Sequence, residues 1–124
     1  MAIAQDIMTT NLITIREDTH VRDAIKIILE NRISGLPVVR DDMSLAGIVS
    51  EKDFLQLAFY DNIDDAEVAD FMSRDVITAT KETSLLEICE LLMQNNYKRI
   101  PIVEDNKLIG VISRKDMLKF VLNS

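Results

Sequence analysis

The sequence has 124 residues, 48% of them hydrophobic, which is ordinary for one globular domain or for two small ones packed together. Its 14 basic and 21 acidic side chains give a net charge of −7, which disfavours general binding to nucleic acid or to an anionic membrane surface. Cys89 is the only cysteine, so no internal disulfide can form, and no segment resembles a signal peptide or a membrane span; we expect a soluble, cytoplasmic protein.

The first half of the chain predicts a short helical turn, a short strand, an amphipathic helix, a hairpin and a second short helix. Apolar residues at helical spacing from Val21 to Leu29 predict the amphipathic helix, and Thr19 is its expected N-cap. Apolar runs on both sides of a polar turn predict the hairpin. Apart from the amphipathic helix and the closing helix after Ser50, the predicted elements are Ile3–Met8, Leu12–Ile15, Leu36–Arg40 and Leu45–Val49.

The second half repeats this order. Asp70-Phe71-Met72-Ser73 follows Asp6-Ile7-Met8-Thr9 at a spacing of 64 residues. Thr83 is the expected N-cap of the second amphipathic helix, and Cys89 and Met93 lie on its expected core face. We therefore predict two copies, residues 1–60 and 61–124, whose apolar sheet faces cover each other, because a unit of about 60 residues buries too little surface alone. The other elements of the second copy are Ala66–Met72, Val76–Ala79, Ile100–Glu104 and Leu108–Ile112.

Each copy contains a strand that leads directly into a helix at a serine. These motifs are Gly47-Ile48-Val49-Ser50-Glu51-Lys52-Asp53 and Gly110-Val111-Ile112-Ser113-Arg114-Lys115-Asp116. The unpaired N–H groups and the positive dipole end of a helix start can hold small anions and hydroxyls. A serine followed three residues later by an aspartate is also the pattern of a capping box, so either motif by itself predicts a cap.

The doubled pattern resembles a tandem pair of cystathionine-β-synthase (CBS) domains. Thr14, the segment Ser34–Val39 and the first glycine motif carry the resemblance, together with the counterparts of all three in the second half. It implies an α+β fold of two pseudo-symmetric β-α-β-β-α units packed sheet to sheet. It also implies regulatory binding of an adenosyl ligand (AMP, ADP, ATP or S-adenosylmethionine) in the clefts between the units.

The resemblance implies that each cleft takes residues from both halves. The last aspartate of the motif would bind the ribose hydroxyls, the serine and nearby basic residues would face the phosphates, and the other half would bracket the adenine. One site would use Lys98, Arg99, Val111, Ser113, Lys115 and Asp116 with Thr14, Thr19 and Ile33. The other would use Ile48, Ser50, Lys52 and Asp53 with Thr78, Thr83 and Tyr97.

The two copies differ in charge near the serine. Lys98-Arg99 corresponds to the uncharged Ser34-Gly35, and Arg114 corresponds to Glu51. We therefore predict that a phosphorylated ligand prefers the site that contains Asp116.

Simpler interpretations stay open for several of these residues. Thr14 and Thr78 can be ordinary strand residues, and Lys98 and Arg99 can be a solvated strand edge. Tyr97 can either pack in the protein or stack on a base.

The sequence favours a regulatory module over an enzyme. One histidine and one cysteine cannot supply a usual metal cluster, and no nucleophile has a recognisable partner base, so we expect no metal and no required cofactor. The leading hypothesis is a ligand sensor that signals to an unidentified protein; the alternative is a ligand-free structural or dimerisation module. Nucleic-acid binding is disfavoured by the charge. A homodimer is expected from surplus apolar residues on the helices: Phe54, Leu55, Leu57, Phe59, Met117, Leu118, Phe120, Val121 and Leu122.

Overall fold

The computed structural model describes residues 1–59, 63–94 and 98–124, and the chain divides into two compact units. The first unit is Ile13–Val76, and the second unit combines Met1–Leu12 with Ile77–Ser124. The predicted repeats, 1–60 and 61–124, are divisions of the sequence, and the compact units divide the chain differently. The first twelve residues fold with the second repeat, and the start of the second repeat folds with the first.

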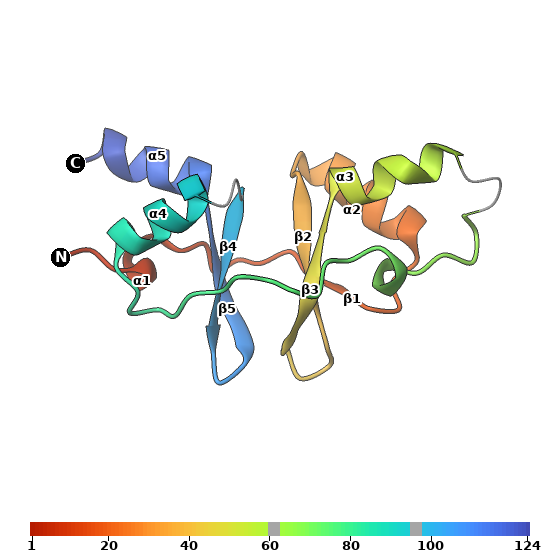
Figure 1. The fold of residues 1–124 in the computed structure, drawn as a ribbon, viewed down its shortest axis with the longest axis horizontal. Coiled ribbons are helices and arrows are strands. Elements are labelled where there is room, and N and C mark those ends of the chain that lie inside the picture. Colours follow the sequence, from red (N-terminus) through yellow and green to blue (C-terminus); the bar gives the residue numbers. More distant parts are fainter. Residues whose placement is uncertain (60–62, 95–97) are drawn as a thin grey trace. The chain divides into compact units, whose positions relative to one another are not determined.

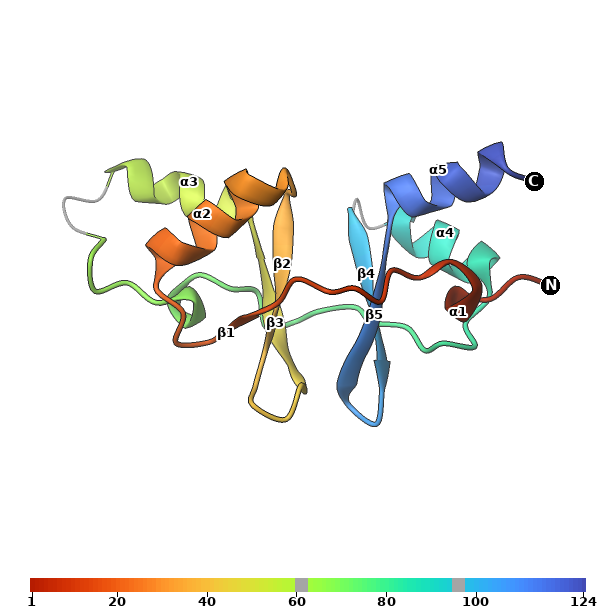
Figure 2. The ribbon, with the colours of Figure 1, turned by 180° about the vertical axis from the view of Figure 1, so that it is seen from behind.

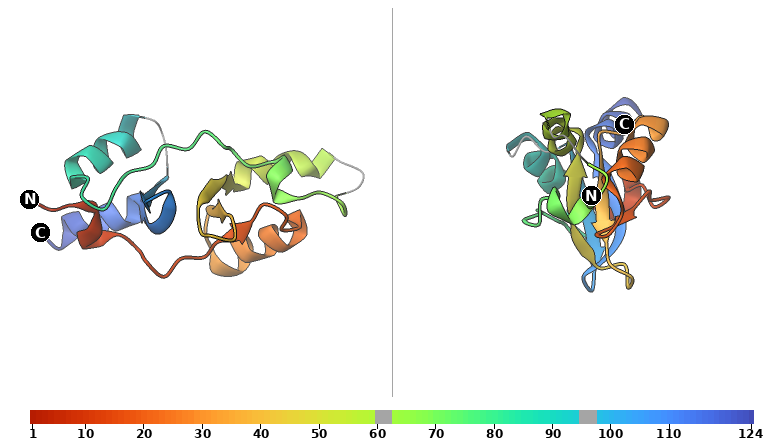
Figure 3. Two further views of the ribbon diagram at one scale, coloured as in Figure 1. Left: turned by 90° about the horizontal axis from the view of Figure 1, so that it is seen from below. Right: turned by 90° about the vertical axis from the view of Figure 1, so that its right-hand side faces the viewer.

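The first unit has a three-stranded sheet in the order β1-β2-β3, with β1 parallel and β3 antiparallel to β2. Helices α2 and α3 lie side by side on one face of the β2–β3 hairpin (Figures 1 and 3). A 3₁₀ turn, η2, brings the start of the second repeat back to this unit. The elements are β1 (Ile15–Arg16), α2 (Val21–Asn31), β2 (Gly35–Val39), β3 (Leu45–Ser50), α3 (Glu51–Leu55), η1 (Gln56–Phe59) and η2 (Val68–Asp70).

The second unit is built on the antiparallel β4–β5 hairpin. Helices α4 and α5 lie on one face of this hairpin, and α1, from the chain's start, lies in the same unit, as Figure 2 shows from behind. The elements are α1 (Ala4–Ile7), α4 (Leu85–Gln94), β4 (Arg99–Glu104), β5 (Lys107–Ser113) and α5 (Arg114–Leu122). The α+β prediction is confirmed.

The first strand of each repeat is shorter than predicted. The predicted strand Leu12–Ile15 pairs only from Ile15, and of Val76–Ala79 only Ala79 pairs, with Ile102. In a parallel pair, a strand two residues longer would need an N–H from Pro37 in the first unit or Pro101 in the second. Proline has none, so the pairing ends there.

Each unit has its own apolar core beneath its helices. In α2, Val21, Ala24 and Ile28 are buried, whereas Leu29 is 71% exposed. The prediction that Cys89 and Met93 belong to the core is wrong: Met93 is 76% exposed and Cys89 is only half-buried. Leu29 and Met93 each follow the first residue of their helix by eight positions, and eight positions turn a helix by about 80° beyond two full turns. This rotation turns both side chains away from the buried face of the helix.

The helix caps are also one residue later than predicted. The N-cap of α2 is His20, whose Nδ1 accepts from the Arg22 N–H at 3.1 Å. At α4, the Ser84 hydroxyl accepts from the Glu87 N–H at 3.2 Å. Thr19 and Thr83 instead accept from backbone N–H groups three residues earlier, each at 3.0 Å, and so close the turn before each helix.

One ion pair occurs in both units with its charges exchanged. Arg40 at the end of β2 lies 3.3 Å from Glu17, and at the equivalent positions Lys81 lies 2.9 Å from Glu104. The hydrogen bond and the negative charge of Glu104 raise the pKa of Lys81. Both pairs join the segment before the amphipathic helix to the end of the following strand.

The two glycines of the repeated motif differ in the atoms that an added side chain would meet. A Cβ at Gly47 would lie 2.6 Å from the Ser73 carbonyl oxygen, and this oxygen is fixed by a hydrogen bond from the Ile48 N–H. A Cβ at Gly110 would instead meet the side chain of Met8, which is flexible. We expect Gly47→Ala to destabilise the protein by about 1–3 kcal/mol and Gly110→Ala by less than about 1 kcal/mol. Urea unfolding of both variants tests this, and equal losses would contradict it.

Candidate functional site

The end of β5 and the start of α5 form a polar junction in the second unit. Ser113 is the N-cap of α5, and the Asp116 Oδ2 accepts from the Ser113 N–H at 2.8 Å and from its hydroxyl at 3.0 Å. The Asp116 N–H donates back to the Ser113 Oγ at 3.2 Å. The capping interpretation is therefore confirmed here. The cap uses only the Oδ2 oxygen of Asp116. The Asp116 side chain is half-buried, and its second carboxylate oxygen, Oδ1, takes no part in the cap.

Thr9 joins this junction from the far end of the sequence. Its backbone forms two hydrogen bonds with Val111, of 2.9 and 3.0 Å, and its hydroxyl lies 3.5 Å from Asp116 Oδ1. Thr9 is not among the site residues predicted from the sequence. The repeated Asp-x-Met-Thr/Ser segment was the available signal, but a contact across 107 positions cannot be read from spacing.

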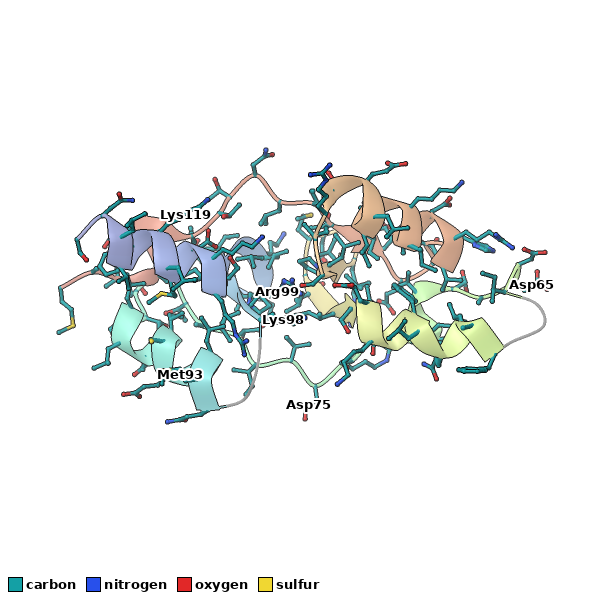
Figure 4. The ribbon with its side chains drawn as sticks, turned by 90° about the horizontal axis from the view of Figure 1, so that it is seen from above. Asp65, Asp75, Met93, Lys98, Arg99 and Lys119 are labelled. Carbon is teal, nitrogen blue, oxygen red and sulfur yellow. The ribbon has the colours of Figure 1, made fainter. Side chains whose placement is uncertain are left out.

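Basic residues surround the same helix start. Arg99 lies directly opposite Ser113 in the β4–β5 pairing, and the Lys98 carbonyl accepts from the Arg114 N–H at 3.1 Å. Figure 4 shows Lys98 and Arg99 together at the beginning of β4. The exposed Lys115 follows in the first turn of α5. The helix has nine residues, and its positive dipole end lies beside four basic residues, an arrangement that suits an anionic group. These residues are Lys98, Arg99, Arg114 and Lys115.

The first unit repeats this geometry without most of the charge. Asp53 Oδ2 accepts from the Ser50 N–H at 2.8 Å and from its hydroxyl at 3.2 Å, so the aspartate half of the predicted capping box is confirmed here. Ser73 pairs with Ile48 as Thr9 pairs with Val111. Gly35, however, stands opposite Ser50, where the second unit has Arg99.

The residues of each predicted site are divided between the two compact units. The hairpin residues Lys98, Arg99, Val111, Ser113, Lys115 and Asp116 lie in the second unit, and Ile48, Ser50, Lys52 and Asp53 lie in the first. The residues predicted to complete the two sites are described in the opposite unit: Thr14, Thr19 and Ile33 in the first, and Thr78 and Thr83 in the second. Tyr97 lies outside the described residues.

Three of these completing residues have local roles within their own units. Thr19 and Thr83 close turns through their hydroxyls, and their carbonyls accept from the N–H groups of Val68 and Ala4 respectively. Ile33 packs against the core of the first unit. Their predicted contacts with an adenine stay a prediction.

The described ranges contain no group of three or more His, Cys, Asp or Glu side chains that could hold a metal ion. Within the same ranges, no helix is both long enough and apolar enough to span a bilayer.

Comparison with known sequences finds the CBS domain twice, at residues 4–60 and 68–123. An uncharacterized protein of Methanocaldococcus jannaschii is 33% identical over 118 residues, which are 94% of this chain and 42% of that protein. The inosine-5'-monophosphate dehydrogenase of the same organism is 37% identical over 117 residues, which are 94% of this chain and 23% of the enzyme. The chain thus spans less than half the length of these two relatives.

Solved structures share the fold over almost the whole chain. CBSX2 in complex with AMP is 30% identical, with a TM-score of 0.90 over 99% of this chain and 98% of that one. CBSX2 from Arabidopsis thaliana is 28% identical, with a TM-score of 0.90 over 98% of this chain and 94% of that one. The CBS domain pair of a protein in complex with 5-methylthioadenosine and S-adenosyl-L-methionine is 23% identical, with a TM-score of 0.86 over 99% and 98% of the two chains; at this identity the likeness concerns the fold.

Proposed function

Because this chain belongs to the CBS domain family, as a tandem pair, we propose that it is a regulatory module that binds an adenosyl ligand and signals its presence to a partner protein. The observation that carries the proposal is the junction at Asp116, where a carboxylate, two hydroxyls and several cations meet at one helix start. The AMP complex of CBSX2, which this chain matches along its whole length, supports an adenine nucleotide as the ligand.

The junction suits the two polar parts of a nucleotide. The carboxylate of Asp116 can accept from ribose hydroxyls, and such charge-assisted hydrogen bonds are the stronger kind. Arg99, Lys98 and Lys115, with the helix N-terminus, can bind phosphate. The equivalent place in the first unit has Gly35 opposite its serine, so we propose that phosphorylated ligands prefer the second unit's residues.

Calorimetric titration with AMP, ADP, ATP and S-adenosylmethionine tests the proposed function. We expect saturable binding of at least one of these compounds. If none of them binds, the alternative gains support: a ligand-free structural or dimerisation module. We propose no enzymatic activity; the matched dehydrogenase is an enzyme, but the chain spans only 23% of its length.

The charge at Arg99 predicts a selective loss. Arg99→Ala should weaken AMP binding about tenfold or more and leave adenosine binding nearly unchanged, because a charged hydrogen bond to phosphate is worth about 1.5–3 kcal/mol. Lys107→Ala is the matched control, since the exposed Lys107 stands at the opposite end of the same hairpin. Equal weakening of AMP and adenosine by Arg99→Ala would show that Arg99 does not act through phosphate.

We also propose a homodimer, with the exposed apolar face of α5 in the interface. Leu118, Val121 and Leu122 are 67%, 63% and 83% exposed, and their spacing places them on one side of the helix. Phe54 and Leu57, predicted from the sequence to be surplus apolar surface, are instead buried in the first unit's core.

Light scattering at micromolar concentration should therefore give the mass of a dimer. Leu118→Lys should shift it towards the monomer because a charge would enter an apolar interface. Leu86→Lys, at a similarly exposed leucine of α4, should leave the dimer intact. A monomeric parent protein would refute the proposal.

A further inference from the structure

Thr9 is held in place by its backbone while its hydroxyl faces the candidate site. The two hydrogen bonds with Val111 fix the Thr9 main chain beside β5. The hydroxyl lies 3.5 Å from Asp116 Oδ1, while Oδ2 of the same carboxylate already accepts twice from Ser113. A hydrogen bond from a hydroxyl to a carboxylate is normally about 2.5–2.7 Å long. The Thr9–Asp116 contact is therefore loose, and a third group can displace it at little cost.

A ribose hydroxyl fits between these two groups chemically. It can both donate and accept a hydrogen bond, whereas an ionised carboxylate can only accept. Asp116 Oδ1 can accept a hydrogen bond from a ribose hydroxyl, and the Thr9 hydroxyl can donate a hydrogen bond to the oxygen of the same ribose hydroxyl. We infer that Thr9 and Asp116 bind one ribose hydroxyl together, which makes Thr9 a specificity-determining residue for ribose over deoxyribose; this rests on the proposed function.

The first unit has the same backbone arrangement. Ser73 occupies the place of Thr9, with its N–H and carbonyl bonded to Ile48 at 2.8 and 2.9 Å. Each unit thus places a residue with a hydroxyl beside the strand that leads to its serine and aspartate. The backbone pairing alone would accept many other side chains, so the common feature of the two positions is the hydroxyl.

The test compares ligands that differ by one hydroxyl. AMP, 2'-deoxy-AMP and 3'-deoxy-AMP are titrated calorimetrically into the parent protein and into Thr9→Val, which keeps the branched shape but removes the hydroxyl. We expect Thr9→Val to weaken AMP about three- to tenfold, as for one hydrogen bond. Thr9→Val should not change the affinity for the deoxy analogue that lacks the ribose hydroxyl bound by Thr9 and Asp116. Thr9→Ser should restore AMP binding, and Thr10→Val, at the exposed neighbouring threonine, should match the parent.

Three results would overturn the inference. Undiminished AMP binding by Thr9→Val would show that the hydroxyl makes no contact with the ligand. An equal loss for AMP and both deoxy analogues, without rescue by Thr9→Ser, would show that Thr9 acts only through the backbone arrangement. If the parent itself binds no AMP, both the proposed function and this inference fail, whereas the first two results leave the proposed function standing.

Discussion

Replacing Asp116 by alanine should reduce the affinity for AMP by at least about tenfold, and by more than a hundredfold if two ribose hydroxyls lose their acceptor. Each hydrogen bond to a charged group is worth about 1.5–3 kcal/mol, and each 1.4 kcal/mol is a factor of ten. The substitution also removes the acceptor of the Ser113 N–H and hydroxyl, so it should destabilise α5 by about 1 kcal/mol. Calorimetry, combined with a melting curve to confirm folding, measures both effects.

Asp53→Ala is the matched control for this prediction. Asp53 forms the same two hydrogen bonds with Ser50, so its loss should cost a similar amount of stability. It should leave most of the AMP affinity in place, because Gly35 supplies no charge where Arg99 stands in the other unit. Equal loss of AMP binding in the two variants would refute the proposed asymmetry.

Deleting residues 1–9 should lower the free energy of unfolding by at least about 3 kcal/mol. The segment makes five backbone hydrogen bonds to the second repeat, with Lys81, Thr83, Leu85 and Val111, and each contributes about 1 kcal/mol. Ala4 is fully buried in the second unit's core, and Ile7 and Met8 pack against that core. Urea unfolding, followed by far-ultraviolet circular dichroism, measures the loss.

Deleting Asn123 and Ser124 provides the comparison for a terminal truncation. Both residues are exposed and follow the end of α5, so this deletion should change stability by less than about 0.5 kcal/mol. If the deletion of residues 1–9 were equally mild, the first twelve residues would not belong to the second unit's core.

Local patterns predicted most of the secondary structure. The hairpins, the amphipathic helices and the capping boxes depend on side-chain period and on residues three apart, which are visible along the chain. The errors were made where a neighbour in space decides. Pro37 and Pro101 cannot donate to a longer parallel strand, and the faces of α2 and α4 leave Leu29 and Met93 exposed.

The candidate site was predicted less completely than the fold. Asp116, Ser113 and the basic residues near them follow from the repeated motif and the family resemblance, and the hairpin register explains why Arg99 stands beside Ser113. Thr9 could not be assigned, because its contact with Asp116 depends on which hairpin the N-terminal segment joins.

The sequence by itself determined the doubled β-α-β-β-α pattern and the charge difference between its copies, because both depend only on residue types that are close together along the chain. It could not assign the segments Asp6–Thr9 and Asp70–Ser73, which are so alike that either suits either hairpin. Only the tertiary structure decided this: Met8 covers Gly110, and Met72 covers Gly47. Each segment thus packs on the hairpin of the other repeat, because the buried contacts and backbone hydrogen bonds that hold it are long-range.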